Sequence, residues 1–401
     1  MNDIFQSVQL APRDPILGLN EQFNSDNRPG KVNLGVGVYY DDNGKIPLMK
    51  AVYKSELSHI EKSTPKGYLP IDGIASYNKG AMNLLLGQNS SIIEEDRALT
   101  VQTLGGTGAL KIGADFLKQL FPNSKVLISN PSWENHKALF ERAEFEVEYY
   151  PYYNPLTRGI AFEEMLETLR NAKDNTIVVL HACCHNPTGV DPTTHQWEEI
   201  AKTIQARNLI PFLDIAYQGF GEDLETDSNV VRMFATMGIN CFISSSFSKS
   251  FSLYGERVGA LTIITNNKNE TSNVLSQIKR IIRTIYSNPP THGATIVSSI
   301  LNSSELFQLW ETELSDMRTR IKSMRKQLVN KIKEHGAKQD FNFVLNQKGM
   351  FSYSGLTTKQ VDDLRNKFAV YAVSSGRICV AALNNNNIDI VASSIAKVLN
   401  S

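Results

Sequence analysis

Short apolar runs alternate with amphipathic stretches through the middle of the chain. The runs have the length of strands, and the stretches between them repeat apolar residues at helical spacing. The runs are residues 126–129, 146–150, 176–181, 209–214, 241–245 and 258–264, and the helical stretches are residues 133–143, 162–171, 194–207 and 230–237. This alternation predicts an α/β fold with a mostly parallel sheet that is covered on both faces.

The pattern changes towards the end of the chain. Residues 272–285 predict an amphipathic helix, and a longer charged helical pattern begins beyond Ser304 and ends at Gly336. The shorter mixed segment that follows predicts strands near 341–345, 350–353 and 378–382. We therefore expect a large domain, residues 46–315, and a small domain formed by residues 1–45 and 316–401.

Composition narrows the class of protein. The 401 residues include 41 basic and 41 acidic side chains, so there is no basic excess of the kind that nucleic-acid binders show, and no apolar run is long enough to span a membrane. The spacing of the four cysteines fits neither a zinc site nor a secretory framework, and we expect no metal. Met1–Gln6 lacks the pattern of a signal peptide, so we expect a cytoplasmic protein.

Polar residues follow four of the predicted strands. They occur in NPSW (130–133), HACCHNPTG (181–189), DIAYQGF (214–220) and SSSFSKSFSLYGERVG (244–259). Taken singly, Asp214 fits a turn cap, Asn186 a turn and Trp133 a core aromatic. Ligands of open α/β sheets bind beyond the carboxyl ends of the strands, so four such stretches at one edge predict a binding site.

A glycine-rich turn runs into a helix in LGGTGALKIGADFL (104–117). Free backbone amides at a helix start suit a phosphate, and Thr107 adds a hydroxyl. The stretch matches neither a Walker loop nor G-x-G-x-x-G, so a single phosphate fits better than a dinucleotide.

Lys249 lies among serines directly after a predicted strand. Most lysines are solvated charges, but one at a strand end is also a candidate nucleophile for a carbonyl cofactor such as pyridoxal phosphate. That cofactor needs a phosphate cradle, a carboxylate at its ring nitrogen, donors to its phenolic oxygen and an aromatic surface. The sequence has a candidate for each of these.

With these residues in view, the chain resembles class I pyridoxal-phosphate aminotransferases of fold type I, in the aspartate and aromatic amino acid branch. The resemblance runs from KVNLGVGVYYDDNGKIPL (31–48) to SSGRICVAAL (374–383), and YLPIDG, GGTGAL, NPSWENH, HACCHNPTG, DIAYQGF, SFSKSFSLYGERVG and YSNPP follow in the family's order. It implies a large domain with a seven-stranded, mostly parallel sheet covered by helices, and a smaller mixed α/β domain built from both termini.

The resemblance also implies a role for each site residue. Lys249 is expected to form the Schiff base and to carry protons, Asp214 to hold the ring nitrogen protonated, and Tyr217 and Asn186 to bond the phenolic oxygen. Trp133 is expected to stack on the ring. The expected phosphate ligands are Gly106, Thr107, Ser246, Ser248 and Arg257, with Tyr68 from a partner subunit. His136 and His181 are either a support for Asp214 or structural histidines.

Substrate binding follows from the same resemblance. Arg377 matches the arginine that binds the α-carboxylate, with help from Gly37, Asn186 and Trp133, and Tyr353 is expected to reach the substrate. Arg283 matches an arginine that crosses a homodimer to a side-chain carboxylate. The expected partners are therefore small-molecule substrates, that is amino acids and 2-oxo acids, and a second copy of the chain, without nucleic acid or membrane.

The sequence leaves the preferred substrate open. Tyr40 and Ile46 resemble members that accept aromatic amino acids, whereas Val38, Thr107 and Asn288 resemble members restricted to aspartate. We expect ping-pong transfer from tyrosine, phenylalanine and aspartate to 2-oxoglutarate, with an aspartate-restricted enzyme as the alternative. Two other readings are a pyridoxal-phosphate decarboxylase or β-eliminating enzyme, which two carboxylate-binding arginines disfavour, and a non-catalytic protein that binds a phosphorylated ligand.

Overall fold

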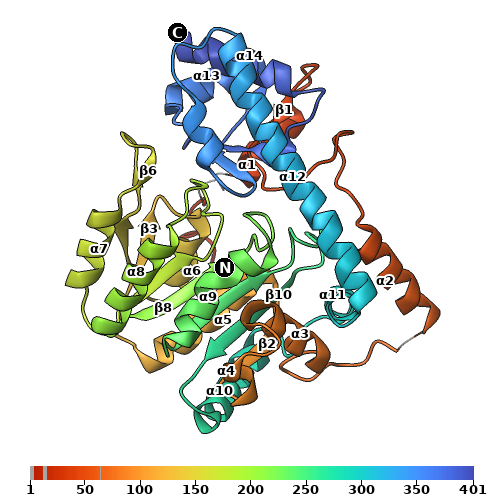
Figure 1. The fold of residues 1–401 in the computed structure, drawn as a ribbon, viewed down its shortest axis with the longest axis vertical. Helices are drawn as coiled ribbons and strands as arrows, with labels where there is room; N and C mark the ends of the chain where they lie inside the picture. Colours follow the sequence, from red (N-terminus) through yellow and green to blue (C-terminus); the bar gives the residue numbers. More distant parts are fainter. Residues whose placement is uncertain (1–3, 12–15, 64) are drawn as a thin grey trace.

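The centre of the computed structural model is a seven-stranded sheet (Figure 1). The structure describes residues 4–11, 16–63 and 65–401, so part of the Met1–Gln6 stretch considered above lies outside the described residues. Across the sheet the strands are β2 (Ala98–Leu104), β10 (Val258–Ile264), β9 (Cys241–Ser246), β8 (Ile210–Ile215), β7 (Ile177–His181), β3 (Lys125–Asn130) and β4 (Glu146–Pro151). Only β10 among them runs antiparallel to its neighbours, β2 and β9. The predicted mostly parallel seven-stranded sheet is confirmed.

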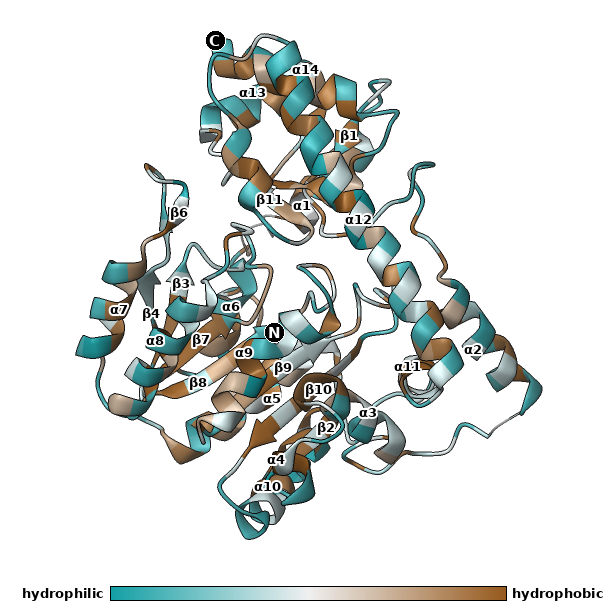
Figure 2. Cartoon of the chain, viewed as in Figure 1, coloured by the Kyte–Doolittle hydropathy of each residue, from teal (hydrophilic) through white to brown (hydrophobic). Residues whose placement is uncertain are grey.

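The inner strands send alternate side chains to the two faces of the sheet. In β7, Ile177 and Val179 belong to one apolar cluster, and Val178 and Leu180 belong to the other. All five residues of β7 are buried, because helices cover both faces (Figure 2). Such strands read as continuous apolar runs, which is why the sequence revealed them.

Helices form a layer on each face of the sheet. The first cluster joins α5 (Gly105–Leu120), α6 (Glu134–Arg142) and α10 (Lys268–Ile285) to the strands. The second cluster includes α3 (Ala75–Leu86), α7 (Phe162–Asn171), α8 (Thr194–Ala206), α9 (Leu224–Thr236) and α11 (His292–Leu301). Side-chain caps begin several of these helices: Thr193 and Gln196 form a capping box on α8, and Asp223 and Asn267 accept backbone N–H bonds at the starts of α9 and α10.

A second body lies above the sheet in Figure 1, and one long helix connects the two. This helix, α12 (Ser304–Glu334), packs against α2 (Lys50–Glu61) and α11 near its start and against α14 (Ile388–Asn400) further along. The upper body also contains α1 (Leu17–Ser25), β1 (Val32–Asn33), η1 (Asn342–Asn346), β11 (Phe351–Tyr353), α13 (Thr358–Phe368), β12 (Val370–Tyr371), β13 (Arg377–Cys379) and η2 (Val380–Ala382). The remaining elements are α4 (Ser91–Glu94) and the hairpin of β5 (Tyr153–Asn154) and β6 (Gly159–Ile160).

Two short sheets join segments of the upper body that are far apart in the sequence. β1 pairs with β12 in parallel, and β11 pairs with β13 in antiparallel register, which places Tyr353 opposite Arg377. Segments from near the start and the end of the chain thus lie side by side. The division into residues 46–315 and residues 1–45 with 316–401 stays a prediction; its second boundary falls within α12.

Two of the expected elements differ from the structure. The strand expected at 341–345 is wrong: this segment is the 3₁₀ helix η1. Phe341 and Val344 are both buried, and three residues per turn bring them to one side, as the 3₁₀ geometry requires. The strand expected at 378–382 is β13 followed by the 3₁₀ turn η2.

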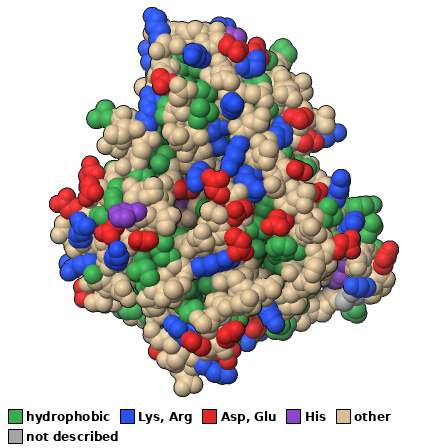
Figure 3. Space-filling model, in the orientation of Figure 1, with side chains coloured by type: hydrophobic (Ala, Val, Ile, Leu, Met, Phe, Trp, Pro, Cys, Tyr) green, Lys and Arg blue, Asp and Glu red, His purple; other side chains and the backbone are tan. Residues whose placement is uncertain are grey.

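The surface carries both signs of charge. On the face shown in Figure 3, Lys and Arg side chains are interspersed with Asp and Glu side chains. Among the residues that the structure describes, no helix has both the length and the apolar character that crossing a membrane requires.

Candidate active site

A cavity of about 430 Å³ lies where β7, β8 and β9 end, between the large sheet and the upper body. Thirteen of the residues that the sequence predicts for the site line it: Gly37, Gly106, Thr107, Trp133, His181, Asn186, Asp214, Tyr217, Ser246, Ser248, Lys249, Arg257 and Arg377. A larger cavity of about 940 Å³ lies near the start of β3 and the end of α7, and its lining contains none of the predicted site residues. The smaller cavity is therefore the candidate active site, because the predicted site residues gather there.

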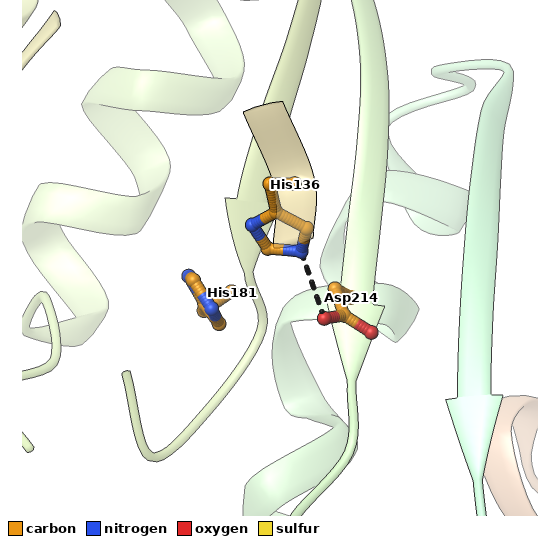
Figure 4. A group of neighbouring side chains, drawn as sticks. All are labelled: His136, His181 and Asp214. Carbon is orange, nitrogen blue, oxygen red and sulfur yellow. Dashed lines mark hydrogen bonds and ion pairs between the residues drawn. The ribbon is translucent and has the colours of Figure 1, made fainter. Parts of the chain in front are cut away.

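Asp214 lies on β8 and is 5% exposed. Its Oδ2 is 3.1 Å from Nε2 of His136 (Figure 4). Its Oδ1 accepts a hydrogen bond of 3.0 Å from the hydroxyl of Ser244. Burial raises the pKa of Asp214, but the hydrogen bonds and the adjacent His136 and His181 rings lower it by more, so the pKa lies below its ordinary value. The protein thus keeps a carboxylate ionised at the floor of the cavity.

Three histidine rings form a row behind Asp214. The rings of His136 and His181 are 4.9 Å apart, and those of His181 and His185 are 4.4 Å apart. Burial, the main cause, and the neighbouring rings hold the pKa of His181 well below its ordinary value. His136, His181 and Asp214 offer ligand atoms within 4.8 Å of one another, but the bond between His136 and Asp214 occupies the facing atoms of that pair.

Lys249 lies just beyond β9, and its amine is 5.0 Å from the centre of the Tyr217 ring. Burial lowers the pKa of Lys249 to about 8, although the charge of Asp214 raises it. Near neutral pH this amine exists partly in its neutral, nucleophilic form, which an exposed lysine rarely does.

The start of α5 and Arg257 together form one side of the cavity. Among the described residues no side chain caps α5. The N–H of Gly105 donates to the carbonyl of Arg257 at 2.8 Å, and the amides of Gly106 and Thr107 follow at the cavity. Gly105 has a φ of +66°, and a Cβ there would overlap the guanidinium of Arg257. Arg257 Nη1 donates to the hydroxyl of Ser248 at 3.2 Å. Free amides, hydroxyls and a guanidinium in this arrangement can bind a phosphate.

Arg377 forms the opposite wall from β13 and is 1% exposed. Its Nη1 donates to Asn186 Oδ1 at 3.0 Å and its Nη2 to the carbonyl of Gly35 at 2.6 Å. The guanidinium lies over the ring of Phe351 at 4.2 Å, and its Nε has no hydrogen-bond partner among the described residues. A buried guanidinium bonded only to neutral oxygens can bind a carboxylate.

This geometry can now be compared with known proteins. The family model of class I and II aminotransferases matches residues 29–395. The chain belongs to this family.

Individual relatives cover almost all of the aminotransferase. It is 57% identical to an aspartate aminotransferase of Pseudomonas aeruginosa and 46% identical to an aromatic-amino-acid aminotransferase of Escherichia coli, in each case over 99% of this chain and 100% of the relative. The crystal structure of an aromatic-amino-acid aminotransferase from Burkholderia pseudomallei, covalently bound to pyridoxal phosphate, is similar with a TM-score of 0.97, 61% identity and 99% coverage of both chains.

Three residues that were predicted to contact the cofactor or the substrate lie outside the cavity lining. Tyr68 is 97% exposed, and Arg283 is an exposed residue in the last turn of α10. Tyr353 packs edge-on against Tyr153, with ring centres 5.1 Å apart. His136 is fully buried behind Asp214 and also lies outside the lining.

The sequence did not single out several residues of the aminotransferase site. Tyr254 and Phe351 line the cavity, and Tyr254 accepts a hydrogen bond of 3.0 Å from the N–H of Tyr39. Ser132 lies 3.0 Å from Nδ1 of His136. Tyr254 and Ser132 fall within motifs that the sequence did mark, whereas Phe351 carried no signal because an apolar residue in a short strand resembles any core position.

Proposed function

We propose that this aminotransferase moves the amino group of tyrosine, phenylalanine and aspartate to 2-oxoglutarate in a ping-pong reaction, with pyridoxal 5′-phosphate as cofactor. The products are the corresponding oxo acid and glutamate. The observation that carries the proposal is one cavity that contains an amine of lowered pKa and a buried guanidinium. The amine belongs to Lys249, and the guanidinium of Arg377 keeps one N–H without a partner among the described residues. Relatives named for aspartate and for aromatic amino acids support the breadth of substrates.

The residues present fit this cofactor. Gly106 and Thr107 at the start of α5, with Ser246, Ser248 and Arg257, would hold the phosphate. The space at this position depends on Gly105, where any Cβ would displace Arg257.

The ring of the cofactor would be held by a second group of residues. Asp214 would bond the ring nitrogen, Trp133 would cover the ring, and Tyr217 and Asn186 would donate to the phenolic oxygen. All four line the cavity. When bound, the cofactor supplies an electron-withdrawing ring that stabilises negative charge at the substrate Cα.

Lys249 has the properties of the base. Its pKa of about 8 leaves part of the amine neutral near pH 7, and a neutral amine can accept the proton from the substrate Cα. The charge of Asp214, kept by His136 and Ser244, stabilises a protonated ring nitrogen. Arg377 binds the α-carboxylate and orients the Cα–H bond towards Lys249.

We further propose a homodimer with shared active sites. Tyr68 and Arg283 are exposed and lie outside the cavity of their own chain, so they are available to the cavity of a second copy. Exposed apolar side chains on and before α2 support an interface there, and they are Ile46, Leu48, Tyr53, Leu57 and Ile60. A monomer in sedimentation equilibrium at micromolar concentration would contradict this part of the proposal.

The state of the cysteines is the basis for a proposal about where the protein works. Cys183, Cys184, Cys241 and Cys379 are all free and buried. Free thiols fit a reducing compartment, so we propose that the aminotransferase works in the cytoplasm.

The function is tested by turnover of three donors side by side. We expect the purified protein with pyridoxal phosphate to absorb visible light and to transfer amino groups from aspartate, tyrosine and phenylalanine to 2-oxoglutarate. The kcat/KM values should lie within about two orders of magnitude of one another, because Lys249 and Arg377 would act on the α-amino and α-carboxylate groups that all three donors share. Lys249→Ala should abolish turnover, whereas Lys359→Ala, at an exposed position on α13, should not. Turnover of aspartate alone would favour the aspartate-restricted alternative.

A further inference from the structure

The loop between β7 and α8 carries Asn186 into the site, and Asp191 fixes the backbone of this loop. Oδ2 of Asp191 accepts the N–H of Cys184 at 2.7 Å, and Oδ1 accepts the N–H of His185 at 2.8 Å. These two bonds hold the backbone of Cys184 and His185, the residues that directly precede Asn186. A carboxylate is suited to this, because both of its oxygens accept and neither donates.

Further contacts restrict the same loop. Nδ1 of His185 is 2.8 Å from the hydroxyl of Thr188, and Thr188 also accepts the N–H of Val190 at 3.2 Å. Gly189 has a φ of +67°, and a Cβ there would lie 3.0 Å from the carbonyl oxygen of Phe351. These contacts restrict the backbone of the loop on both sides of Asn186.

The loop also contacts the upper body. The N–H of Lys348 donates to the carbonyl of Gly189 at 2.6 Å. Lys348 precedes Phe351 by three residues, and the ring of Phe351 lies under the guanidinium of Arg377. Asn186 Oδ1 accepts from Arg377 Nη1 at 3.0 Å. Asn186 thus supplies the only side-chain hydrogen bond that Arg377 makes among the described residues.

We infer that Asp191 is a positioning residue for substrate binding: by fixing the backbone at Cys184 and His185, it sets Asn186 against Arg377 and so orients the guanidinium for the substrate carboxylate. This inference rests on the proposed function of Arg377 and extends it to a residue that does not line the cavity. Asp191 acts on the wall that contains Arg377, whereas Asp214, on the opposite wall, is held by His136 and Ser244.

The test compares Asp191→Asn with a matched variant, Asp227→Asn. Asp227 is also largely buried and accepts the backbone N–H groups of Gly219, Gly221 and Glu222, none of which belongs to the loop between β7 and α8. Its carboxylate lies within 4.8 Å of the Sγ atoms of Cys183 and Cys184, so this variant changes the same neighbourhood without removing a backbone bond of the loop. An asparagine at either position turns an NH₂ group towards a backbone N–H and loses at least one bond. Both variants should therefore melt at a lower temperature than the unmodified protein.

The deciding measurement is the affinity of the holoenzyme for succinate, an unreactive dicarboxylate, by titration calorimetry. We expect Asp191→Asn to raise the Kd of succinate and the KM values of both substrates about tenfold, as when one hydrogen bond to a charged group is lost, with kcat changed much less. Asp227→Asn should leave the Kd unchanged. An equal Kd in the unmodified protein and Asp191→Asn would overturn the inference, whereas no succinate binding by the unmodified protein would overturn the proposed function itself.

A double-mutant cycle shows whether the effect passes through Asn186. In an Asn186→Ala background, Asp191→Asn should change the succinate Kd by no more than about twofold. A full and additive effect in that background would overturn the inference. If Asp191→Asn does not fold, Asp191→Glu takes its place, because glutamate keeps both acceptor oxygens. This variant should show a smaller rise in the succinate Kd. A folded Asp191→Glu variant with a lower melting temperature and an unchanged Kd would overturn the inference.

Discussion

The cavity lies between a wall made by the large sheet and a wall made by the short sheets, and a buried charge on each wall can be compared with the other. Asp214, on the large sheet, has protein partners for both carboxylate oxygens, His136 and Ser244. Arg377, on β13, bonds only the neutral oxygens of Asn186 and Gly35 and keeps Nε without a partner among the described residues. The protein thus supplies hydrogen-bond partners for both oxygens of Asp214, whereas the guanidinium of Arg377 keeps an N–H that a ligand can bond.

This difference separates two kinds of function. A buried charge without a counter-charge destabilises the fold, so a protein retains one where a ligand supplies the partner. A buried charge with complete partners keeps its ionisation state while ligands change around it. We therefore expect changes at Asp214 to act mainly on kcat, and changes at Arg377 to act mainly on KM.

The largest effect is expected for Asp214→Asn. Asparagine has no negative charge to stabilise a protonated ring nitrogen, so kcat should fall roughly 10²- to 10⁴-fold. Steady-state kinetics with aspartate would measure it. Asp223→Asn, at the exposed start of α9, should leave kcat unchanged because asparagine is an equally good helix cap. A fall in kcat below tenfold for Asp214→Asn would mean that the charge of this wall is not used in the reaction.

A smaller effect on a different parameter is expected for Arg377→Lys. A lysine keeps the charge but loses the planar fork that binds a carboxylate through two N–H groups, so KM for aspartate and 2-oxoglutarate should rise about 10- to 100-fold. Arg365→Lys on α13, away from the cavity, is the control and should change nothing. An equal loss in kcat and in kcat/KM for Arg377→Lys would remove the distinction between the two walls.

The smallest effect is on the titration of Lys249, which follows β9 on the wall made by the large sheet. In the apoprotein, the acetylation rate of this amine by acetic anhydride, measured by peptide mass spectrometry, should show a midpoint near pH 8. Asp214→Asn removes the charge that raises this pKa, so the midpoint should move lower. A midpoint at the ordinary lysine value of about 10.4 would show that burial does not act as the structure indicates.

The same shift affects stability, and its sign follows from linkage. The pKa of Lys249 is lower in the folded protein than in the unfolded chain, so the charged amine destabilises the fold fully below about pH 8. This penalty declines as the pH rises from about 8 towards the unfolded value of about 10.4. Comparing Lys249→Met with the unmodified apoprotein across this range would isolate the contribution.

Most of the large sheet could be predicted because its strands are buried on both faces. An apolar run such as residues 177–181 has few structures available to it when turn residues bound it. The first turn of α9 was missed because residues 224–229 are mostly polar, and the error at 341–345 arose because a buried Phe341 and Val344 fit a short strand and a 3₁₀ turn about equally. Short elements depend on tertiary contacts more than on pattern.

The candidate site divides in the same way. Asp214, Lys249, Asn186 and Trp133 were found because polar residues at consecutive strand ends must meet at one edge of a parallel sheet. The roles of Tyr68, Arg283 and Tyr353 stay predictions, because these residues lie outside the cavity of a single chain.

The sequence by itself determined the strands, the helices between them, and the edge of the sheet where reactive side chains gather, because these follow from local periodicity and from the direction of parallel strands. Only the tertiary structure decided the pKa of Lys249, the partners of Asp214 and the position of Arg377. Burial has to be known before a pKa can be, and the bond from Arg377 to Asn186 joins residues 191 positions apart. Such contacts are set by how the two bodies pack, which no local pattern encodes.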